Sequence, residues 1–63
     1  MQRHELYDHA KAEYLRCCKV RLNSWERHYN QAYMAFLRDF IAIVEGRTAE
    51  SIQTEYEEKA RAT

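Results

Sequence analysis

The stretch LRCCKVRLNSWERHYNQAYMAFLRDFIAI, residues 15–43, decides the fold because one apolar stripe runs along its whole length. Successive members of the stripe are three or four residues apart, which is the spacing of side chains on one face of an α-helix, and they fall within an arc of roughly 80°. The stripe consists of Leu15, Cys18, Leu22, Trp25, Tyr29, Tyr33, Phe36, Phe40 and Ile43. Such a stripe must be buried, and a chain of 63 residues has little of itself to bury it against.

The composition favours a single, mostly helical domain over residues 1–63. Apolar residues make up 46% of the chain and aromatic residues 13%, which is more than disordered chains contain. One glycine and no proline leave few residues that interrupt a helix. We therefore predict a mostly α fold of two to three helices that forms a homodimer, because the stripe needs cover from a second chain. A short strand over residues 18–22 or 40–44, paired with a second copy, is the alternative for those two stretches.

Local signals place the boundary between the first two helices. We expect one helix over residues 4–22 and a stronger one over residues 24–45, with Asn23 and Glu26 forming a capping box at the start of the second. Because the stripe passes this junction without losing phase, one continuous helix of about 42 residues is the rival model. A break is favoured, since helices longer than ~25 residues are unusual in a small globular chain.

A turn is expected over residues 44–48, followed by a weak C-terminal helix over residues 49–61. Gly46 stands where a left-handed helix cap is expected. Thr48 can cap the next helix, with Glu50 in its first turn favoured by the helix dipole. The apolar stripe of this last helix is thin and consists of Ala49, Ile52, Tyr56 and Ala60. This helix can dock onto the others but is too short to be stable alone.

The second helix carries two apolar surfaces. We predict that the first forms the shared core of the dimer, consisting of Leu22, Trp25, Tyr29, Tyr33, Phe36, Phe40 and Ile43. Met34, Leu37 and Ile41 widen the apolar arc past half of the helix circumference, so this helix is covered from more than one side. We predict that these three residues edge a groove for an amphipathic helix of a partner, with anchors at i, i+3 or i+4, and i+7.

No motif in the chain indicates catalysis, and we expect no enzyme activity, metal or cofactor. A zinc-protease helix needs two histidines four residues apart, whereas His4 and His9 are five apart. A disulfide between the neighbours Cys17 and Cys18 would be strained, and Cys18 belongs to the apolar stripe, where a free cysteine packs as a small hydrophobe. Gly46 is the only glycine, so no glycine-rich phosphate loop exists.

The net charge of zero gives no global attraction to nucleic acid or to an acidic membrane. Basic residues nevertheless gather in the middle of the chain, and an alternative function is the binding of structured RNA or DNA through a basic surface. The candidate contacts are Arg16, Lys19, Arg21 and Arg27. No apolar run approaches the ~20 residues of a membrane span, and the N-terminus has no apolar signal core. We therefore expect a cytoplasmic protein with no membrane partner.

From MQRHELY at residues 1–7 to EEKARAT at residues 57–63, the chain resembles the small early-region, pro-lytic accessory proteins of lambda-like temperate phages. These are encoded between the exonuclease and excisionase genes, and one of them has the same 63-codon length. The resemblance covers the whole chain and rests on its length and character. It implies an early regulator that binds a host or phage protein in the bacterial cytoplasm to favour lytic development, built as an intertwined homodimer of helices plus a short strand. On architecture, the chain is also similar to plasmid copy-control proteins, which are helical-hairpin dimers that bind paired RNA loops.

Overall fold

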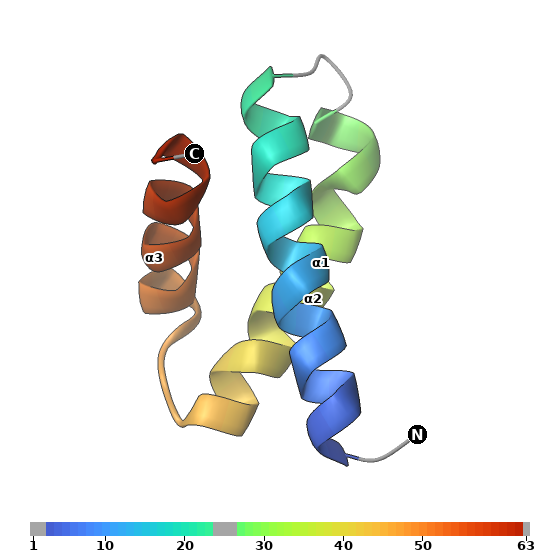
Figure 1. The fold of residues 1–63 in the computed structure, drawn as a ribbon, viewed down its shortest axis with the longest axis vertical. Helices are drawn as coiled ribbons and strands as arrows, with labels where there is room; N and C mark the ends of the chain where they lie inside the picture. Colours follow the sequence, from blue (N-terminus) through green and yellow to red (C-terminus); the bar gives the residue numbers. More distant parts are fainter. Residues whose placement is uncertain (1–2, 24–26, 63) are drawn as a thin grey trace.

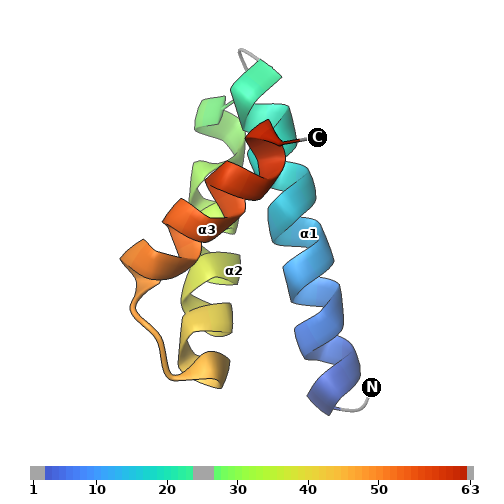
Figure 2. The same cartoon turned by 60° about the vertical axis from the view of Figure 1, so that its left-hand side comes forward.

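The computed structural model describes residues 3–23 and 27–62, with side chains described at positions 4–20 and 31–62. It contains the helices α1 (Arg3–Asn23), α2 (Arg27–Glu45) and α3 (Ala49–Arg61), so the mostly α prediction is confirmed. Both stretches considered as strands, 18–22 and 40–44, lie within helices. Figures 1 and 2 show α1 and α2 side by side, and Figure 2 shows α3 lying obliquely across them.

The predicted break between the first two helices is confirmed, because α1 ends at Asn23 and α2 begins at Arg27. Two hydrogen bonds show that these helices run antiparallel. Tyr7 donates its hydroxyl hydrogen to the Glu45 carboxylate, and Tyr33 donates to Oε2 of Glu13 at 2.9 Å. The start of α1 therefore lies beside the end of α2, which excludes the continuous-helix alternative. The predicted capping box of Asn23 with Glu26 lies outside the described side chains.

The turn after α2 forms as its single glycine predicts. Gly46 has φ of +66°, the left-handed conformation that only glycine adopts without strain. Its N–H bonds to the Ile43 carbonyl at 3.4 Å, and the Arg47 N–H bonds to the Ala42 carbonyl at 3.0 Å. This pair of bonds is the Schellman motif, which satisfies carbonyls that a helix end otherwise leaves without a partner.

The third helix begins at the predicted cap. Thr48 has an extended backbone, and its side-chain oxygen accepts a hydrogen bond from the Ser51 N–H at 3.1 Å. The Ser51 hydroxyl in turn donates to the Thr48 carbonyl at 3.1 Å. Glu50 lies in the first turn, where its charge complements the helix dipole. These contacts are local in sequence, which is why the sequence alone could place the start of α3.

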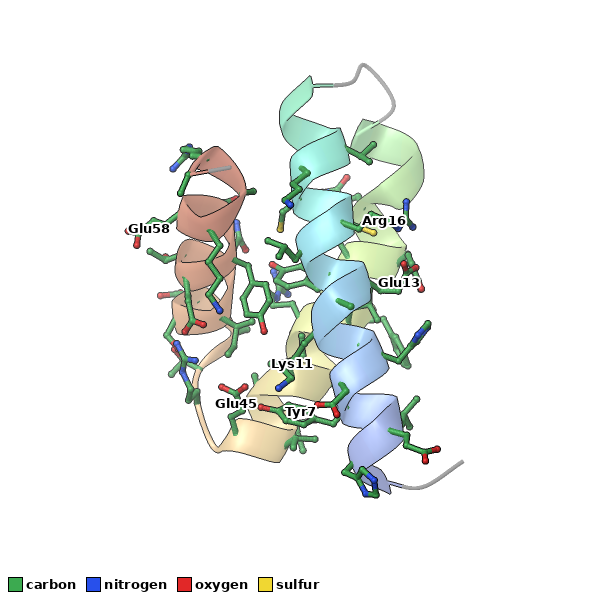
Figure 3. The ribbon with its side chains drawn as sticks, in the orientation of Figure 1. Tyr7, Lys11, Glu13, Arg16, Glu45 and Glu58 are labelled. Atoms are coloured by element: carbon green, nitrogen blue, oxygen red, sulfur yellow. The ribbon has the colours of Figure 1, made fainter. Side chains whose placement is uncertain are left out.

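A chain of polar contacts ties the three helices together near the turn. Besides binding Tyr7, the Glu45 carboxylate accepts a hydrogen bond from Nη1 of Arg47 at 2.9 Å. The same guanidinium lies 2.7 Å from the Glu55 carboxylate on α3. Hydrogen bonds from Tyr7 and Arg47 hold the pKa of Glu45 below its ordinary value. Figure 3 shows Tyr7 and Glu45 pointing toward each other, with Lys11 beside them, and the Lys11 ammonium lies 4.1 Å from the centre of the Tyr7 ring.

All three helices contribute to one core, and each packs against the other two. The first helix contributes Ala10, Tyr14, Cys17 and Cys18, which are all buried. The rings of Tyr14 and Tyr56 are 5.1 Å apart between centroids and tilted by 49°, so α1 and α3 meet through an aromatic pair. The remaining buried members of the core are Met34, Leu37, Ile41, Ala42, Ile52 and Ala60.

Candidate interaction surface

The second helix carries an apolar face that the rest of the described chain leaves open. We call it the outer face of α2, and it consists of Tyr33, Phe36, Phe40 and Ile43. The exposed fraction is 43% for Tyr33, 66% for Phe36 and 80% for Ile43, whereas Phe40 is partly buried against the core. Their spacing of three, four and three residues places them within about 80° of the helix circumference. They therefore form one continuous stripe along the outside of the helix.

Two further large apolar side chains are exposed where α1 begins and α2 ends. Val44 follows Ile43 on α2 and is 38% exposed, and Leu6 on α1 is 45% exposed. Leu6 precedes Tyr7, whose hydrogen bond to Glu45 brings the start of α1 to the end of α2. Sequence reasoning missed Leu6 because its place beside α2 depends on that contact, which joins residues 38 positions apart.

The predicted partner groove requires a correction. Met34, Leu37 and Ile41 have exposed fractions of 6%, 4% and 0%, so in the single chain they do not edge an open groove. They belong to the same core cluster as Ile52 and Tyr56 of α3. The physical reason is that α3, although its stripe is thin, supplies apolar cover from within the chain. The wide apolar arc of α2 requires cover on this side, and helices of the same chain provide it instead of a partner.

The predicted dimer core divides into described and undescribed residues. Tyr33, Phe36 and Ile43 are exposed in the single chain, and Phe40 is partly buried. These four positions are therefore available, to different degrees, to a second chain. The other predicted members lie outside the described side chains, namely Leu22, Trp25 and Tyr29. The dimer core stays a prediction.

One charge cluster borders the outer face on the side of α1. The Arg16 guanidinium binds both carboxylate oxygens of Glu13, at 2.7 and 3.1 Å, and the Tyr33 hydroxyl donates to the same carboxylate. Hydrogen bonds from Arg16 and then from Tyr33 lower the pKa of Glu13 to about 2. Along α2, Nε of Arg38 lies 3.1 Å from the carboxylate of Asp39. These charges are paired within the chain.

The candidate nucleic-acid contacts are only partly described. Arg16 is exposed but engaged with Glu13, and Lys19 is partly buried with an interaction of its own. The side chains of Arg21 and Arg27 lie outside the described set. Of the four predicted contacts, the structure describes the side chains of Arg16 and Lys19, and neither of these two is a free cation.

Groups that could carry chemistry are scattered or buried. Within residues 3–23 and 27–62 there is no group of three His, Cys, Asp or Glu side chains arranged to hold a metal ion. Cys17 and Cys18 are free thiols, each only 1% exposed, and burial raises the pKa of Cys17. A buried thiol with a raised pKa is protonated and unreactive at neutral pH. Both cysteines pack as the small hydrophobes that the stripe predicted for Cys18.

None of the described helices is long and apolar enough to cross a membrane. Comparisons of the chain with protein-family models, with curated proteins and with solved structures found no match.

Proposed function

We propose that this chain is a non-enzymatic interaction protein that self-associates through the outer face of α2 and also binds another protein. The observation that supports this proposal is the exposure of large apolar side chains along one line of the helix, above all Phe36 at 66% and Ile43 at 80%. Single exposed apolar residues are ordinary on protein surfaces, but a continuous row of them is typical of an interaction site.

The size of the surface supports a protein partner. The outer face with Leu6 and Val44 exposes roughly 500 Å² of mainly apolar surface, taking ~150–250 Å² as the full surface of an aromatic side chain. The largest apolar patch of a monomeric protein is ~300–600 Å² and often functional. A stable protein interface covers ~800 Å² on each partner, so this face with its polar rim approaches the necessary size.

The resemblance to small phage early proteins suggests the setting of this activity. In that setting the chain acts in the bacterial cytoplasm, as a homodimer that binds a host or phage protein and favours lytic development. Nucleic-acid binding through the basic residues is less well supported, because the Arg16 guanidinium is already paired with Glu13. A salt titration separates the two functions, since binding to a nucleic-acid backbone weakens steeply as salt rises.

Sedimentation equilibrium with a matched pair of variants tests the self-association. Phe36→Glu places a charge at the middle of the outer face, whereas Gln31→Glu places the same charge at an exposed position of the same helix outside that face. We expect the wild-type chain and Gln31→Glu to sediment at twice the chain mass of 7.6 kDa at micromolar concentration, and Phe36→Glu to sediment as a folded monomer. A wild-type chain that is folded and monomeric under these conditions contradicts the proposal.

A further inference from the structure

We infer that a second copy of this chain covers the outer face of α2, with the two α2 helices antiparallel across a two-fold axis level with Arg38. This inference rests on the proposed function and adds the direction and register of the pairing. Tyr33 and Ile43 are each five residues from Arg38, and Phe36 and Phe40 are each two residues from it. An antiparallel pair centred there sets Tyr33 opposite the partner's Ile43 and Phe36 opposite the partner's Phe40.

The exposure of the four side chains favours this direction of pairing. Along the helix the side chains alternate between recessed and protruding: Tyr33 is 43% exposed, Phe36 66%, Phe40 partly buried and Ile43 80%. Antiparallel pairing in this register puts each protruding side chain against a recessed one. Parallel pairing would instead set Ile43 against the partner's Ile43 and Phe36 against the partner's Phe36, leaving gaps at the recessed positions. Close packing at interfaces therefore selects the antiparallel pair.

The charges around the face also suit a second copy. Identical chains bring identical charges to a two-fold interface, so unpaired charges on the rim would repel one another. Here Arg16 is paired with Glu13 and Arg38 with Asp39, and the net charge of the chain is zero. A partner chosen for opposite charge would find little to bind on this rim. The described charges next to this apolar surface are thus paired within the chain.

The hydroxyl of Tyr33 fits the same partner. Burying a hydroxyl without a hydrogen bond costs stability, but this hydroxyl already donates to Glu13 of its own chain at 2.9 Å. The ring can therefore be covered by an aliphatic side chain, such as the partner's Ile43, without losing a polar contact.

The size of the exposed surface also suits a second copy. The roughly 500 Å² of exposed surface supplies more than half of the ~800 Å² that each partner of a stable dimer covers.

A charge-pairing experiment tests the register directly. Tyr33→Lys and Ile43→Glu change exposed positions that face each other only in the antiparallel pair. Each variant alone should self-associate on the order of tenfold or more weakly than the wild type, because its dimer sets two charged side chains against apolar side chains of the partner. A 1:1 mixture should recover association as a heterodimer, in which the introduced lysine meets the introduced glutamate. Analytical ultracentrifugation measures the association, and circular dichroism checks that each variant keeps its helices.

The matched control is a 1:1 mixture of Tyr33→Lys with Tyr33→Glu, whose charges meet only in a parallel pair. We expect no recovery in this mixture. Recovery in the control alone, or equal recovery in both mixtures, overturns the antiparallel register while leaving self-association through this face intact. Variants that associate as tightly as the wild type overturn the choice of face. A wild-type chain that never associates overturns the proposed homodimer as well.

A disulfide experiment gives a second answer that does not depend on charge. In the antiparallel pair, cysteines introduced by Tyr33→Cys and Ile43→Cys lie together, whereas the two copies of position 43 are ~15 Å apart along the axis. We expect oxidation to cross-link a mixture of the two variants and neither variant alone. The native cysteines are only 1% exposed and react slowly in the folded protein. Cross-linking of Ile43→Cys with itself, and not in the mixture, refutes the inference.

Discussion

Two isoleucines on α2 provide the sharpest test of which face of this helix is internal. Ile41 has no exposed surface, whereas Ile43, only two residues along the same helix, is 80% exposed. Ile41→Ala removes three buried carbon groups, which lowers the free energy of unfolding by ~2.4 kcal/mol at ~0.8 kcal/mol per group. The cavity that remains raises the loss to ~3 kcal/mol. A domain of this length has a stability of only ~6 kcal/mol, so the substitution removes about half of it.

Ile43→Ala removes the same atoms from a side chain that its own chain does not cover. In the monomer we expect a change within ~0.5 kcal/mol, because exposed substitutions have small effects and alanine is the better helix former. Its effect should instead appear in the association of two chains. Urea denaturation followed by circular dichroism, at two protein concentrations 100-fold apart, separates these effects. The midpoint of a dimer rises with concentration, and Ile43→Ala should weaken this rise.

Equal effects of the two substitutions at the lower concentration, where association contributes least, would contradict this assignment of the internal face. A larger destabilisation by Ile43→Ala there would also contradict it, because that result would place Ile43 inside the folded single chain. An unchanged concentration dependence in Ile43→Ala would leave the internal face as described but remove Ile43 from the contact between chains.

The structure also predicts the effects of three other substitutions and the outcome of one labelling experiment. Because the pKa of Glu13 is lowered from 4.5 to about 2, its contribution to stability is complete above pH 4.5 and is lost as the pH falls toward 2. The acid sensitivity of thermal unfolding should therefore be smaller in Glu13→Gln. Gly46→Ala should cost ~1 kcal/mol in urea denaturation, because φ of +66° strains an L-residue although the added Cβ would meet nothing within 4 Å. Thr48→Ala should lower the free energy of unfolding by ~1 kcal/mol, because it removes the side-chain cap of α3. An unchanged free energy would show that the hydrogen bond from the Ser51 N–H to Thr48 does not stabilise the fold. Cys17 and Cys18 should react with a thiol reagent only at the rate at which the protein opens, and rapid labelling of the folded protein would contradict their burial.

The helices could be predicted from the sequence because their signals are local. The left-handed position of Gly46 and the cap at Thr48 each depend on residues within four positions, and both are confirmed. On α1 the buried residues Tyr14 and Cys17 are three positions apart, which is the spacing of side chains on one helix face. The chain has one glycine and no proline, so few residues can interrupt a helix. Local signals are then sufficient to predict where the helices form.

The orientation of α2 could not be predicted in the same way. A stripe that keeps its phase through residues 15–43 suggests one common surface, yet Cys18 is 1% exposed and Ile43, on the same stripe, is 80% exposed. Helical spacing shows which side chains share a face only within one continuous helix. Here α1 ends at Asn23 and α2 begins at Arg27. After the chain reverses, the two halves of the stripe need not face the same neighbour.

The choice between the two apolar faces of α2 depends on long-range contacts that spacing does not encode. The hydrogen bond from Tyr7 to Glu45 joins residues 38 positions apart, and that from Tyr33 to Glu13 joins residues 20 apart. With α2 set in this way, Ile41 enters the core and Phe36 stays outside it. Apolar residues occupy more than half of the circumference of α2. Because α1 and α3 cover only the side that contains Ile41, the apolar residues on the other side stay exposed. The stability of the single chain and the proposed association with a second chain therefore rest on different faces of the same helix, which is why substitutions two residues apart can separate them.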